Sequence, residues 1–197
     1  VPGRTSMESS DSTHRVVIGT DQFDSEIVYY CVPSIMDKAF LTARLKNKSG
    51  TPILPGMARL YMEDNFIGDS YQELVVQDAA FEVAFNKDDR INILFQPLKK
   101  SEDSVSMFGS DIRLKSQFQT QFMSLIPEPV TLIVKDQIPY SLSDKISVEI
   151  TESSPEHAKV TKKGITTWEL TLNPGEKQLL QFGYTVEYPK DLKVVVN

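Results

Sequence analysis

The sequence predicts an all-β protein built from two tandem antiparallel β units of the sandwich or barrel type. Apolar and polar residues alternate with a period of two in nearly every apolar segment, whereas helical periodicity is almost absent. The clearest case runs from Ile112 to Met123, where four apolar side chains share one side of an extended chain: Ile112, Leu114, Phe118 and Phe122. Basic residues and glutamines occupy the other side. This pattern is typical of a strand with one buried and one hydrated face.

The same alternation predicts strands along the rest of the chain. They are Arg15–Gly19, Glu26–Val32, Ala39–Lys46, Met57–Met62, Ala80–Phe85, Arg90–Gln96, Val130–Lys135, Lys145–Thr151, Ile165–Leu172 and Lys177–Tyr188. The stretch from Tyr71 to Phe85 allows two interpretations. Three of its apolar residues could share a helical face, but Asp78 and Glu82 would interrupt that stripe. We therefore favour a strand, a turn and a second strand.

Turn residues separate these segments. The strongest signal is Asn173-Pro174-Gly175-Glu176, where proline presets φ at the second turn position and glycine permits a positive φ at the third. This pattern predicts a type II turn, and we expect it to join the strand of Trp168 to the strand of Phe182 as a hairpin. Lys48-Ser49-Gly50 and Glu63-Asp64-Asn65 predict further turns.

Composition shifts predict the domain organisation. Residues 1–12 are polar and rich in serine, so we expect a disordered head. Pro97 to Gly109 has little apolar content and predicts a linker or long loop. The first β unit is then 13–97 and the second 98–197. Because the chain opens with Val1 rather than Met, we interpret it as a piece of a longer protein.

Charge and hydropathy exclude some classes of function. The chain has 197 residues, with 21 basic and 27 acidic residues and a net charge of −6. This balance argues against a nucleic-acid or anionic membrane partner. No apolar run approaches the length of about 18 residues that a membrane span needs, so we expect no direct membrane insertion by this chain. Cys31 is the single cysteine, which rules out an intrachain disulfide.

The usual catalytic and cofactor motifs are missing from the sequence. A cysteine or serine nucleophile needs a histidine base, and only two are present: His14, near the polar end of the chain, and His157, in a polar loop of the second half. No G-x-S-x-G elbow, no set of four zinc ligands and no glycine-rich phosphate loop occurs. We therefore predict no catalytic residue, no metal site and no cofactor, and we interpret Cys31 as a buried core residue. The sequence assigns no binding residues.

Other residues have a structural interpretation beside a functional one. Asp136 with Glu149, or Asp21 with Asp24, could form the carboxylate pair of a glycosidase, but nothing in the spacing distinguishes them from surface carboxylates. Asp88-Asp89 lacks the spacing of a calcium loop. The single tryptophan, Trp168, could be a carbohydrate platform, but it alternates in phase with Thr166, Leu170 and Leu172, which favours the core. We expect Gly56 and Gly68 to be turn or bulge positions.

Several segments, taken in series, resemble a known family. They are Tyr30-Cys31-Val32-Pro33, Ala39-Phe40-Leu41-Thr42-Ala43, Leu54-Pro55-Gly56, Asn65-Phe66-Ile67-Gly68, Asp136-Gln137-Ile138-Pro139-Tyr140-Ser141, Gly164-Ile165-Thr166-Thr167-Trp168-Glu169-Leu170, Asn173-Pro174-Gly175-Glu176 and Tyr184-Thr185-Val186-Glu187-Tyr188-Pro189. From Glu26 to Tyr188, the chain resembles the C-terminal β-rich domain of unknown function of the mucoidy-inhibitor-A-like protein family. The second half is also similar to the immunoglobulin-like repeats of bacterial surface proteins, although no cysteine pair brackets Trp168.

The resemblance implies a context but no activity. Members of this family carry an N-terminal domain and a coiled-coil middle, and bacterial members commonly carry a secretion signal, which implies a periplasmic or extracytoplasmic envelope location. We therefore expect a non-enzymatic structural or protein-interaction module of a larger cell-envelope protein. A protein partner, or a second copy, could add a strand to a sheet edge or dock between the two units. The alternative is a carbohydrate-binding accessory domain or a fragment of a carbohydrate-active enzyme. A cleft with aromatic rings and two facing carboxylates would favour the alternative, and a closed core around Trp168 would favour the module.

Overall fold

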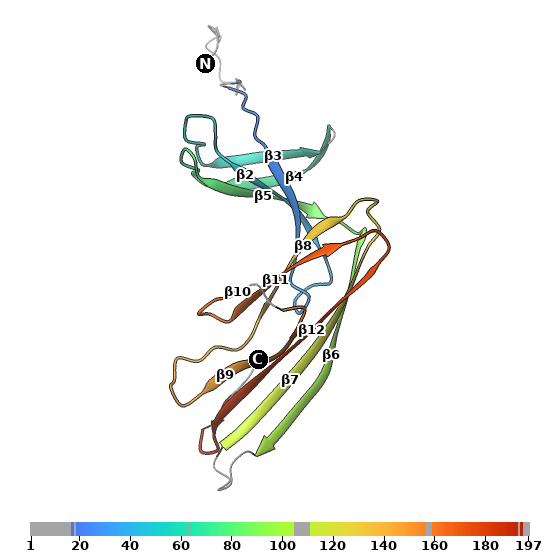
Figure 1. Ribbon diagram of the computed structural model, residues 1–197. Helices are drawn as coiled ribbons and strands as arrows, with labels where there is room; N and C mark the ends of the chain where they lie inside the picture. Colours follow the sequence, from blue (N-terminus) through green and yellow to red (C-terminus); the bar gives the residue numbers. More distant parts are fainter. Residues whose placement is uncertain are drawn as a thin grey trace.

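The chain forms β-strands and connecting segments throughout the part that the structure describes. The computed structural model (Figure 1) describes residues 17, 19–62, 64–104, 111–156, 159–192 and 194, and the predicted head, residues 1–12, lies outside them. The strands are β1 (Ser25–Cys31), β2 (Phe40–Lys46), β3 (Gly56–Met62), β4 (Asn65–Gln72), β5 (Ala80–Lys87), β6 (Ile91–Ser104), β7 (Asp111–Ser124), β8 (Val130–Gln137), β9 (Ser147–Ser154), β10 (Lys159–Val160), β11 (Ile165–Leu172) and β12 (Lys177–Pro189). The described residues contain no helix, so the predicted all-β class is confirmed.

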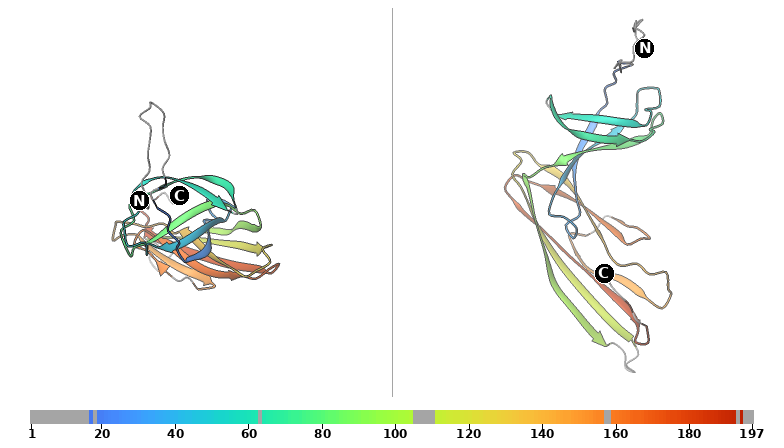
Figure 2. Two further views of the ribbon diagram at one scale, coloured as in Figure 1. Left: turned by 90° about the horizontal axis from the view of Figure 1, so that it is seen from above. Right: turned by 180° about the vertical axis from the view of Figure 1, so that it is seen from behind.

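The strands form two large sheets and a separate hairpin. One sheet has the order β10-β11-β8-β1-β2-β5, the other β6-β7-β12-β9, and β3 pairs with β4 alone. In Figure 1, the long strands β6, β7 and β12 lie against the β8 and β11 side of the larger sheet, while β2 to β5 extend beyond this sandwich at the upper end. The view from behind in Figure 2 shows the same two parts.

Trp168 lies at the centre of the sandwich. Its side chain is fully buried, and its ring meets that of Phe182 from the opposite sheet edge-on, with centroids 4.9 Å apart. The indole N–H donates a hydrogen bond to Ser153 Oγ at 3.0 Å, which satisfies its only polar group. Thr166, Leu170 and Leu172 are buried on the same face of β11. The predicted core role of Trp168 is therefore confirmed.

The division into units 13–97 and 98–197 does not match the strand pairing. β1 from the first predicted unit lies parallel to β8 from the second, with Tyr29 opposite Leu132 and Cys31 opposite Val134. The same hydrophobic core contains Tyr29, Cys31 and Trp168. The two predicted units thus share one sheet and one core. A parallel pair between distant segments leaves no periodic signal in the sequence, which is why alternation alone missed it.

The predicted linker at Pro97–Gly109 is wrong over its first half. β6 continues through the boundary to Ser104, and residues 105–110 lie outside the described part. Proline has no N–H for the ladder and is tolerated on edge strands and at bulges. β6 is an edge strand, and its register with β7 shifts between Pro97 and Lys99. The bulge accommodates the proline, so the strand does not end there.

The Asn173–Glu176 segment forms the predicted turn but not the predicted hairpin. Gly175 has φ of 71°, and the Glu176 N–H donates to the Asn173 carbonyl at 3.3 Å, as a type II turn requires. However, β11 pairs with β8 and β10, whereas β12 pairs with β7 and β9. The turn therefore carries the chain from one sheet to the other. The Gly175 N–H donates to the Ser124 carbonyl at 2.8 Å, which fixes the turn on the end of β7.

A buried asparagine holds the base of the β3–β4 hairpin. The Asn47 amide donates to the carbonyls of Thr51 at 2.9 Å and Val75 at 3.1 Å, and its side-chain oxygen accepts the Ser49 N–H at 3.2 Å. Asn47 is fully buried and lies at the end of β2, so it ties the loop before β3 to the loop after β4. A buried polar group with all its partners present stabilises one arrangement of these loops.

The interpretation of 71–85 as strand, turn and strand is confirmed. β4 ends at Gln72, Asp78 has φ of 61° in the turn, and β5 begins at Ala80. The sequence did not predict the full extent of β4. Gly68 lies at a register shift in this strand, which interrupts the alternation and confirms Gly68 as a bulge position.

We expect Gly175→Val to lower the free energy of unfolding by about 1–3 kcal/mol, because valine is strained at a positive φ. A Cβ at Gly175 meets no atom within 4 Å, so the strain comes from the backbone alone. Gly56→Val is the matched control, since Gly56 also has open space around it but no positive φ. Gly50 has φ of 80° and is not a neutral comparison. Urea unfolding of both variants tests this prediction, and equal midpoints would contradict it.

Candidate functional site

Cys31, the one thiol considered as a nucleophile in the sequence, lies in the core. Cys31 is 2% exposed in the core, and burial, with a smaller contribution from Asp136, raises the pKa of its thiol well above the usual range. A neutral buried thiol is a poor nucleophile. His14 and His157 lie outside the described residues. Cys31 is therefore a core residue, as the sequence predicted.

The structure separates Asp136 from Glu149 and leaves Asp21 and Asp24 exposed on the surface. Asp136 lies on the face of β8 that carries the core residues Leu132 and Val134, whereas Glu149 is exposed on the outer face of the four-stranded sheet. Burial raises the pKa of Asp136, whose carboxylate accepts a hydrogen bond from Ser34 Oγ at 2.8 Å. Asp21 and Asp24 are both exposed, and Asp24 pairs with Lys48 at 3.3 Å. Within the described residues, no cluster of three His, Cys, Asp or Glu side chains could hold a metal ion.

The Asp88-Asp89 segment forms ion pairs with nearby basic residues. Asp88 accepts hydrogen bonds from Arg90 Nη2 at 2.7 Å and from the Tyr29 hydroxyl at 3.1 Å, and Asp89 pairs with Lys38 at 3.3 Å. The Arg90 hydrogen bond is the main cause that lowers the pKa of Asp88. Burial, followed by the charge of Asp88, raises the pKa of Tyr29 to about 12. This arrangement ties the turn between β5 and β6 to the core residue Tyr29.

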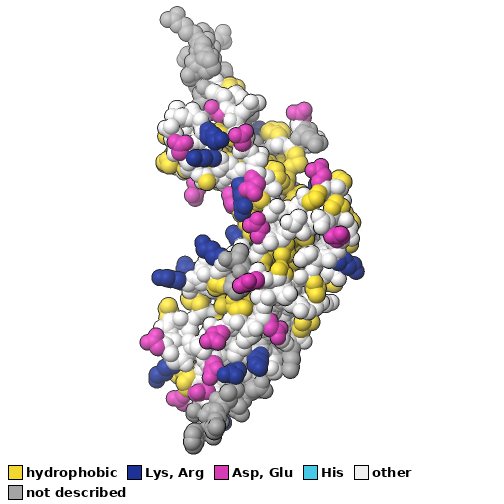
Figure 3. Space-filling view, viewed as in Figure 1, with side chains coloured by type: hydrophobic (Ala, Val, Ile, Leu, Met, Phe, Trp, Pro, Cys, Tyr) yellow, Lys and Arg dark blue, Asp and Glu magenta, His cyan; other side chains and the backbone are white. Residues whose placement is uncertain are grey.

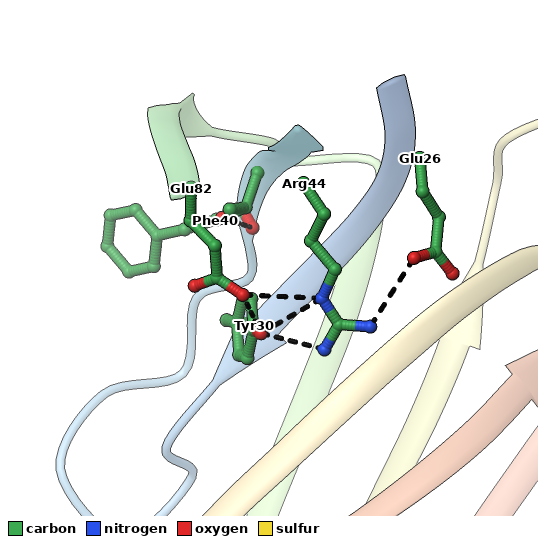
Figure 4. A network of polar contacts seen from close by, with 6 residues as sticks. Glu26, Tyr30, Phe40, Arg44 and Glu82 are labelled. Atoms are coloured by element: carbon green, nitrogen blue, oxygen red, sulfur yellow. Dashed lines mark hydrogen bonds and ion pairs between the residues drawn. The ribbon is translucent and has the colours of Figure 1, made fainter. Parts of the chain in front are cut away.

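A polar network crosses the outer face of the larger sheet (Figure 4). The Tyr30 hydroxyl donates to Glu82 Oε1 at 2.7 Å and accepts a hydrogen bond from Arg44 Nη2 at 2.8 Å. Arg44 also pairs with Glu82 at 3.3 Å and, more weakly, with Glu26 at 3.7 Å. The Lys135 ammonium lies 4.5 Å from the Tyr30 ring centroid, a cation–π distance. The network thus links β8, β1, β2 and β5 in one row.

The network lies where the upper part of the molecule meets the sandwich. Figure 3 shows the front surface hollowed between these two parts, with acidic and basic side chains on both sides. Burial is the largest cause that raises the pKa of Tyr30, followed by its hydrogen bond to Glu82, while Arg44 opposes both. Each polar group of Tyr30 and Arg44 is used by a neighbour. The geometry therefore favours a structural brace over a reactive centre.

The outer face of the β3–β4 hairpin exposes an apolar surface. Three cross-strand pairs lie on it, Met57 with Tyr71, Arg59 with Asp69 and Tyr61 with Phe66. We call these six residues the hairpin face. Its four apolar side chains are 54% to 70% exposed, and the Tyr61 and Phe66 rings meet edge-on at 5.6 Å. The inner face, with Ala58 and Leu60, instead lines a hollow against β5.

The hairpin face was not predicted from the sequence. Met57, Arg59 and Tyr61 alternate as in any strand, and apolar residues in such a strand are expected to face a core. The signal available in the sequence was Arg59, which lies in phase with the two apolar residues and should have marked this face as exposed. A contiguous exposed apolar surface is typical of an interaction site.

The Asp88 contacts predict a pH dependence of stability. A carboxylate whose pKa is lower in the folded state stabilises the fold above its unfolded pKa of 3.8, and this contribution is lost as the pH falls through the folded value. We expect Asp88→Asn to lower the free energy of unfolding by about 1–3 kcal/mol at pH 7, and the difference from wild type to shrink below about pH 4. Asp89→Asn is the control, with a smaller loss because its ion pairs are exposed. A difference for Asp88→Asn that stays constant from pH 7 to pH 3 would contradict this assignment.

The brace predicts a larger effect for Arg44 than for a neighbouring cation. Arg44→Met removes the partner of Tyr30 and Glu82, so we expect a loss of about 1–2 kcal/mol in unfolding free energy. Lys46→Met, on the same strand, is the control, because Lys46 is exposed and forms no ion pair within the described residues. Urea denaturation measures both. If the two variants have the same stability, the network does not act as a brace.

Comparison with known proteins identifies a family but no activity. Residues 1–190 match the family model described as "Domain of unknown function (DUF4139)". The chain is also similar to "Protein F37C4.5" of Caenorhabditis elegans, with 28% identity over 191 residues, which is 90% of this chain and 34% of that protein. The chain therefore spans about a third of the length of this curated relative. No solved structure matches the chain.

These matches agree with the coarser part of the resemblance noted in the sequence, a β-rich domain of unknown function. The mucoidy-inhibitor-A-like family and the immunoglobulin-like repeats stay predictions. Among the residues described, none forms a helix long and apolar enough to cross a membrane. Because the family model covers nearly the whole chain, the chain belongs to the DUF4139 family of domains of unknown function.

Proposed function

We propose that this chain is a non-enzymatic protein-interaction module that joins two copies of itself through the hairpin face. The observation that carries the proposal is the order of the three cross-strand pairs. A pair of opposite charges, Arg59 and Asp69, lies between two apolar pairs. The two charged side chains are 3.8 Å apart and about half exposed, so their charges are only weakly compensated within one chain.

This order makes the face complementary to itself. Consider two hairpin faces stacked about a two-fold axis that runs parallel to the strands. Each β3 then lies over the β4 of the other copy, so Arg59 of one chain faces Asp69 of the other. The same operation places Met57 over Tyr71 and Tyr61 over Phe66. Closed two-fold pairs of this kind use the same patch on both subunits.

The size of the face predicts a weak association. An aromatic side chain buries about 150–250 Å² when fully covered, so two half-exposed faces of this composition bury on the order of 1,000 Å² in total. Specific interfaces start near this size, and the small ones belong to transient complexes. We expect a dissociation constant on the order of 10–100 μM, since ordering the side chains opposes the apolar gain.

The module is proposed to be part of a larger protein. The length of the curated relative supports this, because the matched region is 34% of that protein. The resemblance to the mucoidy-inhibitor-A-like family supports an envelope location, which stays a proposal. Burial of Trp168 removes the aromatic platform on which the carbohydrate alternative relied.

Sedimentation equilibrium of the 197-residue chain tests the association. We expect the apparent mass to rise from 22.2 kDa toward twice that value as the concentration increases from 5 to about 500 μM on the expected affinity scale. Arg59→Asp alone and Asp69→Arg alone should each be monomeric over this range, because like charges then face each other across the interface. The double variant with both changes should associate like wild type.

Mixing the two single variants distinguishes an ion pair between two chains from an ion pair within one chain. The Arg59→Asp chain and the Asp69→Arg chain carry complementary faces only toward each other, so mixing them should restore the dimer. Lys145→Glu, at an exposed position away from the hairpin, is the charge-reversal control and should leave the mass unchanged. A wild-type chain that stays monomeric at 500 μM, or single variants that associate normally, would falsify the proposal.

A further inference from the structure

The chain contains a single acceptor motif for asparagine-linked glycosylation, Asn47-Lys48-Ser49. Such motifs are modified on surface loops, because the attached oligosaccharide is bulky and extends into solvent. Lys48 is exposed in this structure, whereas Asn47 is 0% exposed. The acceptor side chain of a surface modification is therefore buried in the folded chain, and no part of the proposed function uses this motif.

The Asn47 amide nitrogen has no room for a substituent. Its Nδ2 donates to three carbonyl oxygens, those of Thr51 at 2.9 Å, Val75 at 3.1 Å and Val76 at 3.3 Å. The nitrogen carries only two protons, so these contacts use both of them. A sugar attached to Nδ2 replaces one proton by a carbon atom that belongs to a ring. Because protein interiors are close-packed, this ring would overlap the backbone that surrounds the nitrogen.

Rotation of the side chain does not bring the amide nitrogen to the surface without breaking other contacts. Asn47 Oδ1 accepts a hydrogen bond from the Ser49 N–H at 3.2 Å and lies 2.7 Å from the Ser49 hydroxyl. The Asn47 backbone is held as well. Its N–H donates to the Ala79 carbonyl at 2.9 Å, and its carbonyl accepts from the Asp78 N–H at 2.8 Å. Exposure of Nδ2 therefore disrupts the contacts of Asn47 with the loop before β3 and with the loop after β4.

We propose that Asn47 is a glycosylation acceptor only in the unfolded chain, and that an N-glycan at Asn47 and the native fold exclude each other. The donor of this modification is an oligosaccharide linked to a lipid diphosphate. The transfer forms a bond between Nδ2 and the anomeric carbon of the glycan, breaks the bond from that carbon to the diphosphate, and releases one proton from Nδ2. A chain that is still being synthesised presents Asn47 before Val75, which lies 28 residues further on, can enclose it. After the transfer, the base of the β3–β4 hairpin cannot close around the glycan.

This exclusion restricts the compartments in which the chain folds. The lumen of the eukaryotic secretory pathway contains the oligosaccharyltransferase, so an unfolded chain that enters it becomes modified and cannot complete the hairpin. The cytosol satisfies the condition, and so does a bacterial envelope without this enzyme. The inference does not depend on the proposed association, because it rests on the burial of Asn47 and not on the hairpin face.

Secretion from a eukaryotic host that performs this modification tests the proposal. The 197-residue chain and its Ser49→Ala variant are each fused to a cleavable signal sequence and expressed in insect cells. Ser49→Ala removes the acceptor motif but keeps the backbone N–H that donates to Asn47. We expect the wild-type chain to gain a glycan, shown by a mass that falls on endoglycosidase digestion. We also expect its level in the medium to be at least several-fold below that of Ser49→Ala. Produced in a bacterial host without the transferase, both chains should show a cooperative thermal transition.

An acceptor motif at an exposed position is the matched control. Leu94→Thr in the Ser49→Ala chain creates the motif at Asn92, and both positions are exposed on the edge strand β6. We expect this chain to carry a glycan and to be secreted like Ser49→Ala. The proposal is overturned if the wild-type chain is secreted in folded form with a glycan on Asn47, or if it is secreted without a glycan at the level of Ser49→Ala. Retention of the Asn92-modified chain to the same extent as wild type also overturns it, because the block then comes from any glycan and not from its position.

Discussion

The parallel pairing of β1 with β8 is the contact on which the rest of the architecture depends. β1 is bonded to β2 on its other side, so this single strand connects the hairpin-bearing part of the larger sheet to the part that covers Trp168. The chain between β1 and β8 contains six further strands, far more than the connection of about a dozen residues that parallel neighbours require. Neither predicted unit can complete its sheet alone. Because so many contacts join distant segments, the topology favours slow and cooperative folding.

The sequence predicted local structure well and long-range structure poorly. Alternation located β7 and the buried side of β11 because each pattern is contained in one segment. The type II turn at Pro174 and Gly175 was also correct, since its φ requirements are local. The turn does not determine which sheet the next strand joins. That depends on the pairing of β12 with β7, and for this reason the predicted hairpin was wrong. In the same way, Pro97 marks a backbone position without an N–H donor. Such a position fits both a linker and an edge strand, so the residue alone does not distinguish them.

The candidate surfaces were harder to predict than the core. Residues with reactive groups are easy to find in a sequence, but Cys31 packs in the core and Asp136 anchors a loop through Ser34. An interaction surface consists of side chains that no other part of the chain covers. Tyr61 is exposed because, among the described residues, none covers the outer side of its hairpin. This exposure does not follow from the identity of the residue.

The bulge at Pro97 also affects the open edge of the four-stranded sheet. A long, regular edge strand offers a row of free N–H and C=O groups, on which another extended chain can be added without limit, as in fibrils. β6 forms such an edge, and its proline and shifted register interrupt the row near the middle. The other edge, β9, is interrupted by its own irregularity opposite Gly183. Both edges of the four-stranded sheet are thus poor templates for the addition of another extended chain.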